Sequence, residues 1–294
     1  MHLINKSLKL KIFRLLIMKI IYKYPNLLIA EVENRPSKEI KSPYLADLKF
    51  DDGKLFMAHS PALGLCGYIT KGSIVAISEK FNCKNVKRKT KYTIEMVKIK
   101  NDDNKEIWLG ANPCLSNDLF ENIVNKKLID IITKIDFLKR EYQMIIDNEK
   151  SRFDFYIESN NKKFIIEVKN VPIVDYPLNK MPEFRKFPVR VGKRKAIFPD
   201  GYQSKKGECV SPRALKHLQM LIKIKKENKE LTPMLVFIIQ REDCFGFSPN
   251  FEKDPLYSSE LKRAYNEGVI IKAYLMKMSI KQVSFIKEIP VILN

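Results

Sequence analysis

Residues 151–169, SRFDFYIESNNKKFIIEVK, decide the fold of the second half of the chain. Two runs rich in aromatic and β-branched residues flank the turn-forming residues Ser159, Asn160 and Asn161. This pattern predicts two antiparallel strands joined by a tight turn. In such a hairpin, Asp154 of the first strand and Glu167 of the second approach each other.

Side chains alternate between the two faces of a strand, so Glu167 and Lys169 share one face. Two carboxylates and a lysine at one strand end are suited to phosphodiester chemistry. Carboxylate oxygens hold Mg²⁺ or Mn²⁺, the metal activates water, and the lysine orients the nucleophile or neutralises phosphate. Glu141, in the preceding strand-like run, is a candidate third acid that could act as a ligand or a base. The alternative is a plain ion pair of Lys169 with Asp154 or Glu167 at a strand edge.

The elements around this hairpin predict an α/β domain over residues 114–294. A helix is expected over residues 117–139 after a Ser116 cap, followed by three strands and a basic loop over roughly 170–210. Ser-Pro at 211–212 and Asp-Pro at 254–255 each predict a helix start, and Gly268 a helix end. Buried strands are expected at MLVFIIQ and VIIKAYLMKM.

The first half of the chain has a different pattern. Between residues 19 and 112, seven short β-like runs are separated by turn residues such as Asp52-Gly53 and Lys71-Gly72. Residues 18–113 therefore predict a small all-β barrel or sandwich. Residues 1–17 form a basic, acid-free extension before Met18, either an upstream start or an organelle-targeting segment.

Charge points to a polyanionic partner. The 294 residues include 54 Lys and Arg against 34 Asp and Glu, a formal net charge of +20. Three windows, residues 1–30, 80–100 and 180–216, carry nearly all of this excess, whereas codon bias toward lysine would spread it evenly. Nucleic acid is the favoured partner and a membrane surface a distant alternative.

Several other classes are excluded. The five cysteines form no C-x-x-C, which argues against a zinc ribbon or disulfide framework and suits a reducing compartment. Dinucleotide, P-loop and hydrolase-elbow motifs are absent from the sequence. Its most apolar early stretch is too short and too charged for a membrane span.

Together the motifs resemble the sugar fermentation stimulation protein A family. SRFDFYIE, FIIEVKNV, FPD and SPRALKHLQML occur in the family's order, and further matches extend over nearly everything after Met18. The resemblance implies an N-terminal OB-like barrel, a C-terminal α/β domain of the PD-(D/E)XK nuclease type, and DNA binding. It places the nuclease signature on Asp154, Glu167 and Lys169, with Glu141 as the helix-proximal acid. The chain departs from the family at His59-Ser60-Pro61-Ala62-Leu63-Gly64, where relatives have an Asn and a Cys.

Further residues are candidates for phosphate contact. They are Lys87, Arg88 and Lys89 in the β domain, Lys193, Arg194 and Lys195 in the basic loop, and Arg213 and His217 on the helix after Ser-Pro. Solvated loops and a solvated helix face are the alternatives.

Two functions follow from these observations. The first is a cytoplasmic, nucleoid-associated DNA-binding protein that retains a nuclease-like acidic site. The second is a Mg²⁺- or Mn²⁺-dependent nuclease acting on DNA or RNA, with Asp154 and Glu167 as metal ligands. The sequence does not fix an oligomeric state.

Overall fold

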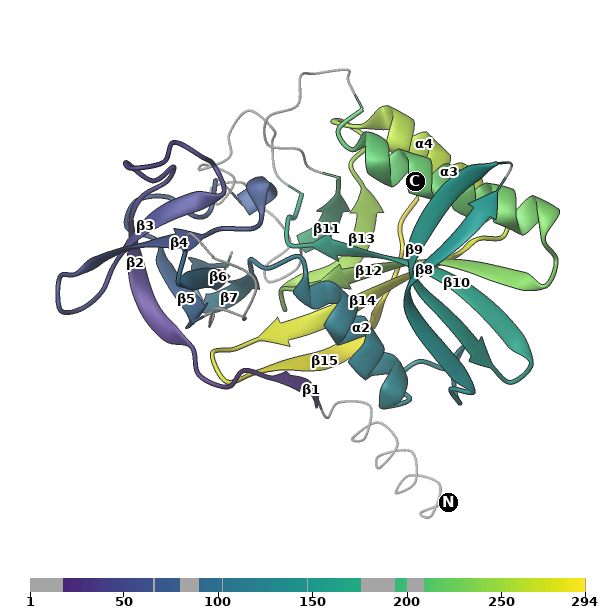
Figure 1. The fold of residues 1–294 in the computed structure, drawn as a ribbon, viewed down its shortest axis with the longest axis horizontal. Helices are drawn as coiled ribbons and strands as arrows, with labels where there is room; N and C mark the ends of the chain where they lie inside the picture. The colour runs from purple at the N-terminus through teal and green to yellow at the C-terminus, as the bar shows by residue number, and fades with distance from the viewer. Residues whose placement is uncertain are drawn as a thin grey trace, which may run out of the picture.

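The computed structural model is mostly β, with one large mixed sheet and few helices (Figure 1). The structure describes residues 18–65, 67–79, 90–101, 103–146, 148–175, 194–199 and 209–293. The elements of the first half are β1 (Lys19–Lys23), β2 (Leu28–Asn34), β3 (Leu45–Lys49), β4 (Leu55–His59), the short 3-10 helix η1 (Leu63–Leu65), β5 (Ile74–Glu79), β6 (Tyr92–Lys100) and β7 (Glu106–Gly110). Those of the second half are α2 (Leu115–Asn125), β8 (Phe137–Ile146), β9 (Glu149–Ser159), β10 (Lys162–Val171), β11 (Arg194–Phe198), α3 (Pro212–Glu227), β12 (Leu231–Ile239), β13 (Cys244–Pro249), α4 (Pro255–Asn266), β14 (Ile270–Met278) and β15 (Gln282–Ile289).

Five strands of the first half close into a ring. Antiparallel pairings run β4–β3–β2–β5–β6, and a parallel contact between β4 and β6 joins the two ends. All seven strands expected between residues 19 and 112 are confirmed. β1 lies outside the ring, however, and pairs with β15 near the C-terminus.

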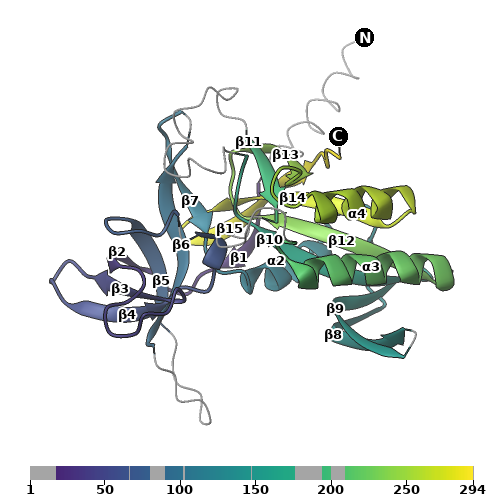
Figure 2. The same ribbon diagram turned by 90° about the horizontal axis from the view of Figure 1, so that it is seen from above.

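The second half continues the same sheet. β7 pairs with β14 at Trp108 opposite Met278, and the order then runs β14–β12–β10–β9–β8. β10, β12 and β14 are mutually parallel, whereas β8 and β9 are antiparallel additions at the edge. The ring and the α3–α4 pair lie at opposite ends of the molecule (Figure 2).

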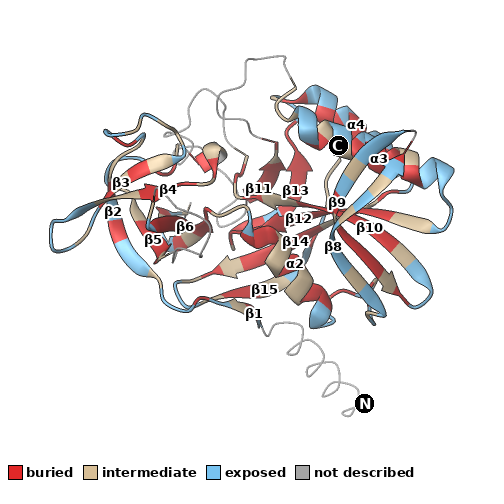
Figure 3. Cartoon of the chain, viewed as in Figure 1, coloured by how far each residue is buried: buried red, intermediate tan, exposed pale blue. Residues whose placement is uncertain are grey.

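Helices cover both faces of this second sheet region. On one face, α3 and α4 pack with Ile165, Leu235 and Phe237. On the other, α2 packs with Ile166 and Val236. Side chains of neighbouring strand residues point to opposite faces, and helices cover both faces. The central strands are therefore buried on both sides (Figure 3).

The helix starts at the two X-Pro motifs are confirmed. Ser211 caps α3 by accepting from the Ala214 amide at 3.4 Å, and Asp254 caps α4 by accepting from the Tyr257 amide at 2.9 Å. The chain leaves α4 near Gly268, whose φ is +87°.

The expected helix over 117–139 is wrong in length and in its cap. α2 ends at Asn125, because Lys127 takes a left-handed φ of 55° and stops the helix. Ile129 and Ile132 continue the helical spacing of apolar residues beyond Asn125. They are buried in the same core as α2 but are not helical. Ser116 is not the cap: it lies in the first turn, and its hydroxyl accepts from Gln240 at 3.1 Å.

The expected loop over roughly 170–210 contains a strand. β11 pairs in parallel with β13 in a separate two-stranded sheet, which the basic composition around it concealed. Within the part of the chain that the structure describes, no helix is both long and apolar enough to cross a membrane.

Candidate functional site

The β9–β10 hairpin forms as the sequence predicts. Asn160 and Asn161 both have positive φ, 49° and 62°, which is the geometry of a tight two-residue hairpin turn. The backbone ladder between the strands reaches Ile166 opposite Phe155. The next pair in this register is Asp154 and Glu167, so the turn and the register together bring the two acids to one place.

The Asp154 carboxylate is held from two sides. Its Oδ2 accepts from the Val168 backbone amide at 2.7 Å, beyond the last ladder pair. Its Oδ1 accepts from Asn117 Nδ2 of α2 at 2.9 Å. Burial raises the pKa of Asp154, and the charge of Glu167 raises it further. Two carboxylates this close therefore favour a shared cation or a shared proton.

Glu167 is the most deeply buried acid of the site, at 3% exposure. Its Oε1 accepts from Lys169 Nζ at 2.5 Å and contacts His217 Nδ1. Burial alone would raise the pKa of Glu167, but the His217 hydrogen bond and the Lys169 charge outweigh it and lower this pKa. The other oxygen, Oε2, is buried and has no hydrogen-bond partner among the described residues.

His217 reaches this cluster from α3. Leu218 and Leu221 of that helix pack into the core, so the neighbouring His217 lies at the boundary between the helix and β10. Its ring centroid lies 6.4 Å from that of Phe153 on β9. His217 thus joins the site as a partner of Glu167, whereas Arg213 on the same helix is exposed.

Asn117 is a site residue that the sequence did not reveal. It lies in the first turn of α2 and fixes Asp154. The acids beside it, Asp118 and Glu121, are instead engaged with Arg140 at the surface. In the sequence, only its position shortly after Pro113, near the start of a helix, could have suggested Asn117. That position does not show where the helix contacts the sheet.

Glu141 is located on a strand, β8, with a left-handed φ of 51°. Its carboxylate bonds Arg152 Nε at 2.8 Å, and its side chain is 53% exposed. In this conformation Glu141 is part of a surface ion pair and not of the buried cluster.

The remaining phosphate candidates divide in two. Lys87, Arg88, Lys89 and Lys193 lie outside the described residues. Lys195 is half-buried on β11, and Arg194 is only 2% exposed. Arg194 donates to the Asp175 carbonyl at 2.8 Å from inside the protein, so its guanidinium is engaged within the fold, and its contact with phosphate stays a prediction.

A second buried charged pair lies just after β12. Arg241 Nε and Nη2 bond the two oxygens of Asp243 at 2.6 and 2.7 Å, and Arg241 Nη1 donates to the Pro172 carbonyl at 3.1 Å. Both carboxylate oxygens of Asp243 are therefore satisfied by one guanidinium. This pair resembles a structural cross-brace and has no open ligand position on the carboxylate.

Comparison with known proteins places this architecture in a defined class. A family model described as the sugar fermentation stimulation protein RE domain matches residues 114–282, the half that contains the acidic cluster. The chain belongs to the sugar fermentation stimulation protein family.

Relatives of most of the chain share this assignment. A sugar fermentation stimulation protein homolog of Prochlorococcus marinus (strain MIT 9301) is 31% identical over 234 residues, covering 77% of this chain and 82% of the relative. A homolog from Desulfotalea psychrophila (strain LSv54 / DSM 12343) is 28% identical over 254 residues, covering 85% and 88%. The structure of Pyrococcus furiosus SfsA in complex with Ca²⁺ superposes with a TM-score of 0.70 at 21% identity, covering 93% of this chain and 99% of that one, and so shares its fold.

Proposed function

We propose that this chain is a DNA-binding protein with a divalent-cation site of the nuclease type, built on Asp154 and Glu167. One observation carries this proposal: a buried carboxylate oxygen, Glu167 Oε2, has no partner among the described residues. A buried acceptor left unsatisfied is costly, and one that lies beside a second buried acid supports a site for a cation.

The residues present are suited to a hard divalent cation. Asp154 and Glu167 supply carboxylate oxygens, which Mg²⁺, Mn²⁺ and Ca²⁺ prefer. Among the described residues, no group of three or more His, Cys, Asp and Glu side chains is arranged to hold a metal. A cation held by only two carboxylates fits Mg²⁺, which usually keeps several of its waters. The Pyrococcus furiosus SfsA structure is a complex with Ca²⁺, a cation of the same chemical class, and this supports the proposal.

Each side chain then has a role. Asp154 and Glu167 would hold the cation, and a bound Mg²⁺ would activate water and stabilise charge on a phosphate. Lys169, at 14% side-chain exposure, lies at the edge of the cluster where it can meet a phosphate oxygen. His217 and Asn117 keep Glu167 and Asp154 in place through the bonds already described.

The rest of the chain supports nucleic acid as the partner. Five strands in a ring closed by one parallel contact fit an OB-like barrel, a fold that binds oligonucleotides. The second half, with its antiparallel hairpin beside parallel strands and helices on both faces, fits the nuclease-like domain. The formal net charge of the whole chain, +20, favours a polyanion.

A second candidate function is catalysis itself, a Mg²⁺-dependent nuclease that hydrolyses phosphodiester bonds of DNA or RNA. The arrangement of the three signature side chains favours it, because Lys169 bonds Glu167 and Asp154 lies near enough for the charges of both to act on it. A pure binding protein has no need of this complete set.

One experiment tests both functions. Purified protein is incubated with single- and double-stranded DNA and RNA in Mg²⁺ or Mn²⁺, beside Asp154→Asn and Glu167→Gln. Metal-dependent cleavage that both variants lose would establish the nuclease. Binding without cleavage, with an affinity that falls steeply between about 50 and 200 mM salt, would support the DNA-binding function alone. Binding that is insensitive to salt would reject the polyanion proposal.

A further inference from the structure

One end of the five-stranded ring is hollow. β2 begins there at Leu28, β3 ends at Lys49, β4 begins at Leu55, β5 ends at Glu79 and β6 begins at Tyr92. A cavity of about 490 Å³ opens at this end, lined by Leu28, Ile29, Phe50, Asp51, Asp52, Lys54, Phe56 and Tyr92. It lies in the ring, on different elements from the acidic cluster.

Three aromatic rings form the floor of this hollow. The centroids of Phe50 and Phe56 are 5.2 Å apart, and that of Tyr92 lies 5.5 and 5.6 Å from them. Tyr92 is buried, whereas Phe50 and Phe56 are half-buried and reach the surface. Edge-on packing of Phe56 against the other two rings holds all three in place, so little conformational entropy is lost when a flat ligand binds on them.

Part of the rim of the hollow consists of exposed apolar side chains, beside the charged residues Asp51, Asp52 and Lys54. Leu28, Ile29 and Leu55 are 42%, 43% and 58% exposed, although each is a large aliphatic side chain. Single exposed apolar residues are ordinary, but a group of them beside half-exposed aromatic rings marks a binding surface.

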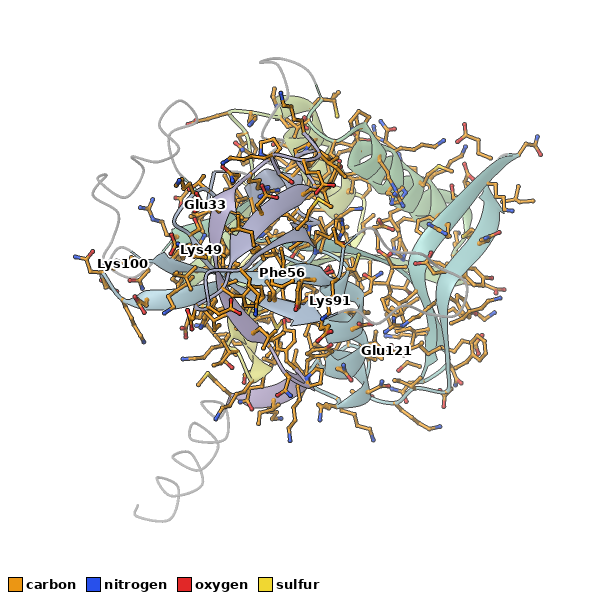
Figure 4. The ribbon with its side chains drawn as sticks, turned by 60° about the vertical axis from the view of Figure 1, so that its left-hand side comes forward. Glu33, Lys49, Phe56, Lys91, Lys100 and Glu121 are labelled. Atoms are coloured by element: carbon orange, nitrogen blue, oxygen red, sulfur yellow. The ribbon has the colours of Figure 1, made fainter. Side chains whose placement is uncertain are left out.

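Lysines flank this apolar floor with acids among them, and Lys91 pairs with Glu79 at 3.0 Å. Figure 4 shows Phe56 between Lys49 and Lys91, and the Lys91 ammonium lies 5.5 Å from the centre of the Tyr92 ring. Lys54 stands at the rim and bonds Asp52 at 2.6 Å.

We propose that the hollow is a stacking site for the bases of a single-stranded nucleic acid, with the phosphates directed to the flanking lysines. The inference rests on the proposed nucleic-acid binding and specifies its substrate class. A single strand can place an unstacked base on Phe56, whereas a duplex keeps its bases inside the helix. A site that combines aromatic rings with lysines suits a base and its phosphate better than it suits a purely aliphatic ligand.

The experiment measures fluorescence anisotropy with three labelled DNA ligands: an oligothymidine strand, an abasic strand of the same length, and a duplex. Wild-type protein is compared with Phe56→Leu, which keeps apolar volume and removes the ring. Phe137→Leu on β8 is the matched control, because the Phe137 ring also reaches the surface, at 48% exposure, but lies in the other half of the chain. Circular dichroism and thermal melting verify that both variants are folded.

We expect Phe56→Leu to weaken oligothymidine binding about five- to tenfold, with abasic and duplex binding changed less than about twofold. Phe137→Leu should bind all three ligands as the wild type does. Equal oligothymidine affinity in wild type and Phe56→Leu would overturn the stacking site while leaving nucleic-acid binding intact. Binding of the duplex alone by wild type would overturn the stacking site in the same way. If wild type binds none of the three ligands, both the stacking site and the proposed DNA binding are rejected.

Discussion

Two of the regions where the chain buries charged side chains differ in how completely those charges are paired. Arg241 and Asp243 bond through two parallel contacts of 2.6 and 2.7 Å, so neither carboxylate oxygen is left over. One oxygen of Glu167 contacts both Lys169 Nζ and His217 Nδ1, whereas the other has no hydrogen-bond partner among the described residues.

This difference distinguishes a buried ion pair that stabilises the fold from a buried carboxylate that is available to a ligand. A closed ion pair is costly to break and has no position for a ligand. An open carboxylate beside a second acid is costly to keep and is retained where it binds a cation. We therefore propose that the Arg241–Asp243 pair serves stability and that the Asp154–Glu167 pair serves cation binding.

Breaking the closed pair should have the largest effect on stability. Asp243→Asn keeps the shape of the side chain but leaves the Arg241 charge buried without a counter-charge. We expect the free energy of unfolding to fall by about 3–5 kcal/mol, measured by urea denaturation at pH 7. A loss below about 1 kcal/mol would show that the pair is not the brace we describe.

Acid should act on the closed pair in a predictable direction. Burial alone would raise the pKa of Asp243, but the charge and hydrogen bonds of Arg241 outweigh burial and lower it. Its stabilising contribution is therefore present above the ordinary aspartate pKa of about 3.9 and is lost as pH falls through the lower folded value.

The double variant Arg241→Met/Asp243→Leu tests this pH dependence. It should unfold at neutral pH with a free energy within about 2 kcal/mol of wild type, because apolar replacement of a buried pair is often tolerated. Below pH 4 its stability should fall less steeply than that of wild type in urea titrations. An unchanged acid slope would mean that other carboxylates dominate acid unfolding.

Asn117 tests the role of the Asp154–Glu167 cluster, because its side chain holds Asp154. Asn117→Ala removes the 2.9 Å hydrogen bond to Asp154 Oδ1 without touching Glu167. We expect cation affinity to fall about threefold to tenfold, near the net value of one ordinary hydrogen bond, as measured by calorimetric titration with Mn²⁺. Asn122→Ala, farther along α2, is a control variant that should titrate as wild type.

Glu141 should give the smallest effect. Its carboxylate is half exposed and bonded to Arg152, so Glu141→Gln removes only a surface ion pair. Stability should change by less than about 1 kcal/mol, and Mn²⁺ affinity should remain within about twofold of wild type. A loss of affinity comparable to that of Asp154→Asn would instead make Glu141 a third acid of the site.

Local patterns predicted the strands and most helix starts. The hairpin at residues 151–169 and the caps at Ser211 and Asp254 depend on neighbouring residues, so the sequence alone specifies them. The meeting of Asp154 and Glu167 follows from hairpin register, which is also local.

Contacts between segments far apart in the sequence could not be predicted from local patterns. The pairing of β1 with β15 joins the two ends of the described chain, and no local pattern specifies it. Asn117 and His217 reach the acids from helices distant in sequence, so their partners depend on helix packing. The length of α2 was misjudged because Ile129 and Ile132 are buried without being helical.

Calorimetric titration of the full chain with Mg²⁺, Mn²⁺ and Ca²⁺, beside Glu167→Gln, tests the assignment of the open pair most directly. We predict that wild type binds a divalent cation and that Glu167→Gln binds it at least about tenfold more weakly. The variant should remain within about 1 kcal/mol of wild type in stability, because the amide still offers Lys169 an acceptor. No cation binding by wild type, or equal affinity in the variant, would contradict the assignment.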